Sequence, residues 1–227
     1  VGLYSAFVAR ESLMARFAQV AGEPAWGPMI LARSQALAGS PIEALDCAEW
    51  MTWMTDVRLG QQASPVLAHF RSPDPTRHWT VSMLSMLDAT ALASSMGLVA
   101  DRASAIRCVA EGTITLAVLR RRGAAIETTN WRTERMVLDI LDGSAGIDPE
   151  GARSIDDADW NMAVELLQQF DVAKRSDIES ARPVFSAIRS LYIDDAMELA
   201  AELHAIKGPW SGGHPGSVDA TSLDDCG

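Results

Sequence analysis

The chain has 227 residues, of which 48% are hydrophobic and 22% charged, and its formal net charge is −11. This composition predicts a globular domain, and the acidic balance argues against nucleic-acid binding and against lying flat on an anionic membrane surface. Three scattered cysteines without a CxxC pair favour reduced thiols in a reducing compartment.

Helices are predicted along the first half of the chain, because apolar residues recur there at spacings of three and four. The first is expected over 1–20 and the second over 25–37. Ser40, Pro41 and Glu43 form an N-cap pattern, which predicts a third helix from Ser40 to about Gly60. A short helix beginning at Ser64-Pro65, a proline loop and a long helix over 76–96 are expected to follow.

The second half continues in the same way. Asp101 is expected to cap a helix that ends in Arg120-Arg121-Arg122, where arginines complement the helix dipole. A short helix is predicted over 132–141 and another around the apolar stripe that begins at Trp160. One last long helix is predicted from near Ser180, with its stripe reaching Ile206. The segment 211–227 is rich in Gly and Ser and is predicted to be a disordered tail.

The fold class predicted from these patterns is all-α. The chain lacks alternating apolar runs bounded by turns, so we expect a multi-helix bundle of about eight or nine helices without significant sheet. The longest runs free of Asp, Glu, Lys and Arg are 59–70 and 89–100, which are shorter than the about 20 residues that a membrane-spanning helix needs. We therefore expect one soluble helical domain over 1–210.

Two acidic pairs are candidates for magnesium binding. Asp156-Asp157 and Asp194-Asp195 resemble in type the paired aspartates that hold magnesium and a diphosphate in helical prenyl-transfer and terpene enzymes. The alternative is that the first pair caps a helix and the second faces water. The four histidines show no ligand spacing. We expect no metal site, no cofactor and no catalytic residues.

The best candidate for a ligand site is the proline-stiffened segment 69–79. It brings Arg71, Arg77 and His78 together in sequence, which favours anion binding, with Trp79 and Asp88 completing the candidate ligand-binding set. The alternative is an ion-paired corner that fixes the angle between two helices, in which these cations pair with Asp74 and Asp88.

Several short segments follow one another in a recognisable order. They are Leu3 to Phe7 with Arg10-Glu11, Ala21-Gly22-Glu23-Pro24, Pro65 to Ser72 with Trp79 and Leu87 to Leu92, and finally Leu191-Tyr192 and Pro209-Trp210. In this order, over 1–210, they resemble the cytoplasmic C-terminal domain of bacterial potassium-channel-family proteins of the two-transmembrane pore type. The first segment resembles the exit of the inner pore helix, the second the first turn, and the last two the closing helix and its stop. The stretch from Pro65 to Leu92 is the most recognisable.

This resemblance implies a regulatory or assembly domain rather than an enzyme. It would lie on the cytoplasmic side of the bacterial inner membrane, with 1–20 continuing an upstream pore helix of the same polypeptide. The partner expected is the chain itself, as a dimer or tetramer, and potassium would pass only through the pore, whose filter this chain lacks. The chain begins without Met, so we expect a fragment or a processed piece of a membrane protein.

Two other functions remain open from the sequence. One is a magnesium-dependent isoprenoid-diphosphate enzyme that uses the two acidic pairs. The other is the ligand-binding core of a helical transcription regulator, although a basic DNA-binding headpiece is not recognisable near the N-terminus.

Overall fold

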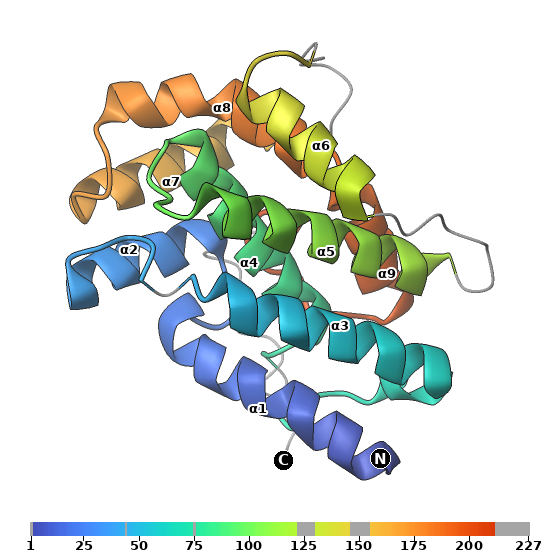
Figure 1. Cartoon of the computed structure of the whole chain (residues 1–227). Coiled ribbons are helices and arrows are strands. Elements are labelled where there is room, and N and C mark those ends of the chain that lie inside the picture. The colour runs from blue at the N-terminus through green and yellow to red at the C-terminus, as the bar shows by residue number, and fades with distance from the viewer. Residues whose placement is uncertain (1, 44, 75, 122–129, 146–154, 212–227) are drawn as a thin grey trace, which may run out of the picture.

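The computed structural model describes residues 2–43, 45–74, 76–121, 130–145 and 155–211. Within these ranges the protein has nine α-helices, one short 3₁₀ helix and no strands, which confirms the all-α prediction (Figure 1). The helices are α1 (Leu3–Ala21), α2 (Gly27–Ala38), α3 (Cys47–Ala63), η1 (Pro65–His69), α4 (Trp79–Ser95), α5 (Arg102–Arg120), α6 (Asn130–Leu141), α7 (Asp157–Gln169), α8 (Arg175–Arg189) and α9 (Ile193–Glu202). The predicted tail over 211–227 lies, except for Ser211, outside the described residues.

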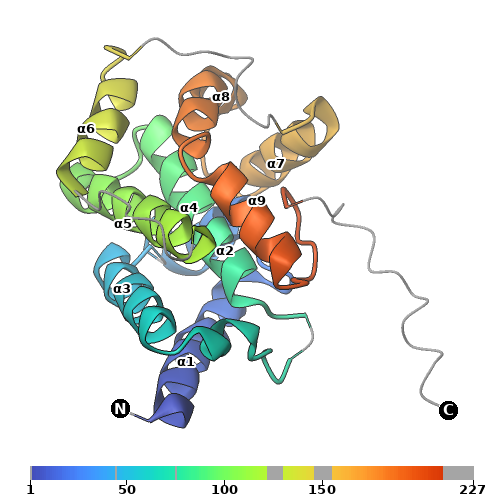
Figure 2. The ribbon, with the colours of Figure 1, turned by 90° about the vertical axis from the view of Figure 1, so that its right-hand side faces the viewer.

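Helix α4 forms the centre of the bundle. Every residue from Trp79 to Ala93 is buried, and the helix packs against α1, α2, α5, α8 and α9 (Figure 2). A helix that is largely apolar on all sides has to be surrounded by others, because no face of it can be left to water at low cost. The long apolar run of this segment therefore places it in the middle of the fold.

The C-terminal turn closes the bundle against an aromatic cluster. Trp210 lies 5.9 Å from Trp26, 6.1 Å from Trp160 and 5.4 Å from Phe185, measured between ring centroids. Aromatic pairs at these separations add stability beyond the area they bury. The cluster joins the last described turn to α7, to α8 and to Trp26, which directly precedes α2, so this turn is held in the core.

The predicted helix start at Ser40 is wrong. Pro41 to Glu43 form a turn, and α3 begins at Cys47, where Asp46 Oδ1 accepts a hydrogen bond of 2.9 Å from Glu49 N. Asp46 satisfies an otherwise unpaired amide of the first helical turn, which is what Ser40 was expected to do.

The last long helix is also predicted wrongly, because the chain forms two helices there. Helix α8 begins at Arg175, before the predicted start, and the chain turns over 190–192 before α9 begins. Both helices bury their apolar side chains in the same core. The spacing of apolar residues by three and four positions therefore continues across the turn, and the sequence pattern does not reveal the break. Pro183 lies inside α8.

None of the helices in the described ranges is both long enough and apolar enough to cross a membrane.

Candidate functional site

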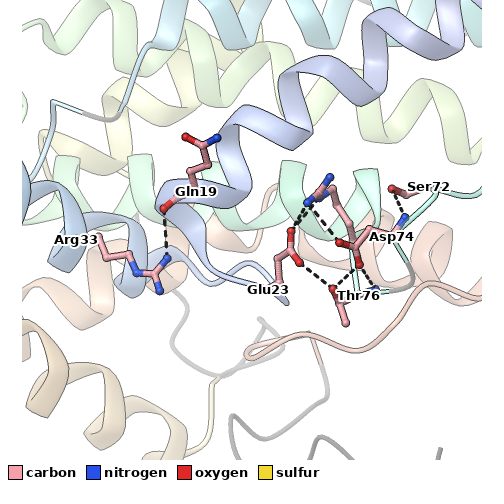
Figure 3. Close-up of polar contacts among 7 residues, drawn as sticks. Gln19, Glu23, Arg33, Ser72, Asp74 and Thr76 are labelled. Carbon is pink, nitrogen blue, oxygen red and sulfur yellow. Dashed lines mark hydrogen bonds and ion pairs between the residues drawn. The ribbon is translucent and has the colours of Figure 1, made fainter. Parts of the chain in front are cut away.

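The predicted ligand segment forms an ion-paired corner around Arg77 (Figure 3). Arg77 Nε donates a 3.0 Å hydrogen bond to Glu23, and its Nη2 lies 3.5 Å from Asp74 Oδ2. The Thr76 hydroxyl lies 3.0 Å from Glu23 Oε2 and 2.7 Å from Asp74 Oδ1. Hydrogen bonds from Thr76, together with the charge of Arg77, lower the pKa of Asp74. Arg77 is therefore engaged by two carboxylates. Its pair with Asp74 agrees with the alternative of an ion-paired corner, but the second carboxylate is Glu23 and not the expected Asp88.

His78 and Trp79 point into the fold rather than toward this corner. His78 is 9% exposed, and its Nδ1 caps α4 by accepting a 3.3 Å hydrogen bond from Thr80 N. Burial lowers the pKa of His78 to about 4, with further lowering by the positive charges of Arg10 and Arg71. His78 is thus neutral near pH 7. Trp79 is 1% exposed, whereas Arg71 is exposed.

Asp88 belongs to a separate network in the core. It is 2% exposed and accepts hydrogen bonds of 3.1 Å from Arg189 Nε and 2.8 Å from the Tyr192 hydroxyl. Arg189 also donates to the carbonyl oxygen of Trp210 at 2.7 Å. Burial raises the pKa of Asp88, and Arg189 opposes that effect. The structure does not bring the five predicted ligand-binding residues together: Arg77 lies in the partly buried corner, His78 and Trp79 are buried at the start of α4, and Asp88 lies in the core. Arg71 is exposed.

The two acidic pairs are held by other contacts. Asp156 caps α7 by accepting from Asp159 N at 2.8 Å, and Asp157 lies 2.8 Å from Arg182. Asp195 forms an ion pair with Arg120. Among the residues that the structure describes, no three His, Cys, Asp or Glu side chains are grouped so as to hold a metal ion.

A groove lies between α1 and α3. Its volume is about 860 Å³, and we call it the α1/α3 groove. The two helices are antiparallel: Trp53 Nε1 donates to Arg10 O at 3.2 Å, and toward the other end Arg16 pairs with Glu49 at 2.5 Å. Its walls include Leu3, Ala6, Leu13, Val57, Leu59 and Leu67. The groove is thus largely apolar, with the Arg16–Glu49 ion pair at one end and with Arg10, Asp56 and Gln61 also in its lining.

Arg10 holds the wall of the groove in place. Its guanidinium is 5% exposed and donates to Leu67 O at 2.9 Å, while the Glu11 carboxylate lies 2.9 Å away. Burial lowers the pKa of Arg10, and Glu11 opposes that effect. Gln61 also lines the groove, is 7% exposed, and its Nε2 has no hydrogen-bond partner in the described structure. The sequence analysis identified neither Arg10 nor Gln61 as a site residue.

The opposite flank of α1 carries an uncharged stripe. Tyr4, Val8, Ser12 and Ala15 are all exposed, and they form one wall of a second, more open hollow of about 660 Å³. We call these four residues the α1 ridge. The charged residues Glu11, Asp74 and Arg77 also line this hollow. Tyr4 is 78% exposed, which is unusual for so large an aromatic side chain. The sequence signal for the ridge is that Tyr4 and Val8 are four residues apart. They therefore lie together on one face of the helix, and this face differs from the one that carries Leu3, Phe7 and Leu13.

Exposed apolar side chains concentrate at this end of the molecule. In the described ranges ten large apolar side chains are exposed, and six of them lie on the first half of α1, late in α3, or on η1 and the residue after it. These six are Leu3, Tyr4, Val8, Leu59, Val66 and Phe70. A concentration of exposed apolar side chains marks an interaction surface more often than isolated ones do.

No protein-family model matches this chain, and neither the curated proteins nor the solved structures gave a match to it.

Proposed function

We propose that this chain is the cytoplasmic assembly and regulatory domain of a bacterial potassium-channel-like membrane protein. The observation that carries the proposal is the concentration of exposed apolar side chains on the first half of α1 and around η1. A strongly acidic protein repels other copies of itself, so an uncharged apolar surface is where such copies can meet without burying charge.

The place of α1 in the fold supports the regulatory part. Helix α1 lies alongside α3 at the edge of the bundle (Figure 1). Its second half is anchored, because Leu13, Met14 and Phe17 are buried, whereas its first half exposes Leu3, Tyr4 and Val8. In the proposed protein, α1 continues an upstream pore helix, so the arrangement of α1 helices beneath the pore biases its opening. Four subunits complete a filter when each chain supplies one pore segment.

The channel part of the proposal rests on the resemblance of the sequence segments described above. Ions would pass through the upstream pore, and the domain acts on the pore rather than on a substrate. In the full protein the domain would lie on the cytoplasmic side of the inner membrane.

Two measurements test the proposal. Light scattering during size-exclusion chromatography is expected to show an oligomer at micromolar concentration, and a monomer at every concentration would overturn the assembly role. The coding sequence upstream of Val1 is expected to encode two apolar spans and a filter motif. Their absence would overturn the channel role while leaving self-association standing.

A further inference from the structure

We propose that Cys47 and Cys108 form a peroxide-sensitive thiol pair, which closes into a disulfide between α3 and α5. Both cysteines are free and are buried in the same apolar core. Cys47 is the first residue of α3, and Cys108 lies within α5. The proposal assigns a redox modification site to the fold, and it stands independently of the proposed channel function.

The two thiols already lie in contact in the reduced fold. Helices α3 and α5 lie side by side (Figures 1 and 2), and a side-chain hydrogen bond joins Cys47 to Cys108 across their interface. Further along, Glu111 on α5 accepts hydrogen bonds of 3.0 Å from the Thr55 hydroxyl and 2.7 Å from Arg58 Nη2, both on α3. These contacts fix α3 against α5, so the two sulfur atoms stay neighbours while the protein remains folded.

The surroundings give the two sulfur atoms different roles. Cys47 is 8% exposed, whereas Cys108 is fully buried, so a small oxidant reaches Cys47 first. The hydrogen bond from Cys108 lowers the pKa of Cys47, while the contact with Cys47 and burial raise the pKa of Cys108. A thiolate is also favoured at the first residue of a helix, because the free backbone amides point toward it. Cys47 is therefore the thiolate that reacts with the oxidant, and Cys108 is the thiol that follows.

Cys47 also has the freedom to move that bond formation needs. Two sulfur atoms in a disulfide lie about 2.05 Å apart, so thiols in hydrogen-bonding contact have to approach each other. Cys47 is at the end of its helix, and helix ends open at a lower free energy than helix interiors. The adjustment is thus confined to the first turn of α3, and Cys108 keeps its place within α5.

The reaction has two steps, and hydrogen peroxide is the oxidant. The Cys47 thiolate attacks one peroxide oxygen, the O–O bond breaks, and the hydroxide that leaves takes up the thiol proton as water. Cys47 is then a sulfenic acid. The Cys108 sulfur attacks the Cys47 sulfur, the S–O bond breaks, and the second hydroxide leaves as water with the Cys108 proton. The two thiols lose two electrons in total, and the peroxide gains them.

Peptide mapping of the oxidised wild-type protein tests the pair directly. The folded chain is treated with hydrogen peroxide, free thiols are alkylated in denaturant, and the digest is analysed by mass spectrometry without reduction. We expect linked peptides that carry Cys47 and Cys108, and an intact mass lower by two hydrogen atoms. Dithiothreitol is expected to reverse both changes. The far-UV circular dichroism spectrum is expected to stay helical throughout, because the bond forms within the fold.

Two variants separate the roles of the sulfur atoms. Both carry Cys226→Ser, and this change alone is the matched control, in which the linked peptides persist. Cys108→Ala removes the second thiol, so the sulfenic acid on Cys47 accumulates and is trapped by dimedone. Cys47→Ser leaves Cys108 buried without its partner, and dimedone is expected to label nothing in that variant. Circular dichroism checks that each variant folds.

Several results would overturn the proposal. Linked peptides that contain Cys226 in place of Cys47 or Cys108, or a disulfide that forms only in urea, would show that the two thiols do not react within the fold. Thiols that stay reduced after prolonged peroxide treatment of the wild-type protein would show a purely structural contact. Dimedone on Cys108 in the Cys47→Ser variant would overturn the assignment of Cys47 as the first thiol to react.

Discussion

Asp88 and Arg77 show how differently two ion-paired residues act in this protein. Asp88 lies in the core with Arg189 and Tyr192, where any unpaired charge is costly. Arg77 lies at the surface, where water screens its pairs with Glu23 and Asp74 and makes them worth little. The core network joins α4 to α8, to the turn before α9 and to the C-terminal turn, so it fixes the relative positions of these segments.

Replacing Asp88 with Ala is expected to lower the free energy of unfolding by about 3–5 kcal/mol, because Arg189 is then left buried without its carboxylate. Urea unfolding followed by circular dichroism measures this. The control is Arg102→Ala, which removes an ion pair with Asp142 whose side chains are both about half exposed, and is expected to cost at most about 1 kcal/mol. Equal losses in the two variants would contradict the structural role of Asp88.

His78 gives the stability a specific pH dependence. Its pKa is about 4 in the fold, below the value of about 6.5 expected in the unfolded chain. As the pH falls below about 6.5, the unfolded chain binds a proton that the folded state does not, so stability is lost down to pH 4. Arg10 on α1 and Arg71 before α4 add to this effect through their positive charge.

The His78→Asn variant isolates this contribution, because Asn can cap α4 but does not titrate. Between pH 7 and pH 4.5 the wild-type protein is expected to lose about 2 kcal/mol more unfolding free energy than the variant. Unfolding curves at both pH values measure the difference. Equal losses of unfolding free energy in the two proteins would show that His78 is already protonated in the folded state at pH 4.5.

At the scale of the helices, the sequence predicted a helix start correctly where one capping residue was available and wrongly where two competed. Asp101 is identified as an N-cap from the sequence, and its carboxylate does accept from Ser104 N at 3.0 Å. Ser40 carries a similar pattern, but the choice between Ser40 and Asp46 depends on packing that the local sequence does not contain. The pairing of Asp88 with Arg189, which are 101 positions apart, could likewise not be predicted from the local sequence.

The site was less predictable than the fold for the same reason. The sequence placed Arg77 beside Asp74, and the structure pairs them, because these residues are three positions apart. The α1/α3 groove requires the angle between two helices and the anchoring of η1 by Arg10, and both depend on contacts distant in the sequence. The sequence offered a signal only for the other flank of α1, where Tyr4 and Val8 are four residues apart.

Two glycines in helices are expected to respond oppositely to Ala. At Gly112 on α5 a new Cβ would lie within 3.0 Å of three atoms of the buried Leu87 side chain, so Gly112→Ala is expected to cost about 1–3 kcal/mol. At Gly60 on α3 the nearest atom is 3.7 Å away, so Gly60→Ala is expected to gain about 0.5–1 kcal/mol. Thermal and urea unfolding measure both. A stabilised Gly112→Ala would mean that Leu87 moves aside freely.

At the scale of the whole molecule, assembly and stability are linked. If copies associate only when folded, dilution shifts the protein toward free, less stable subunits. The midpoint temperature of unfolding is therefore expected to rise with protein concentration in the wild-type chain. In the Tyr4→Asp, Val8→Asp variant it is expected to be independent of concentration. Differential scanning calorimetry over a hundredfold range of concentration measures this, and a wild-type midpoint that does not change would contradict the link.

Helix α1 also has a mechanical consequence. It runs unbroken from Leu3 to Ala21, and no glycine or proline interrupts it, so nothing in its sequence introduces a kink. Its length is about 28 Å at 1.5 Å per residue. A tilt of about 10° about its buried end would thus displace the Leu3 end by about 5 Å. Because α1 is stiff, a small change in its packing against α4 would become a larger displacement at Leu3, the end to which the upstream pore helix of the proposed channel would be joined.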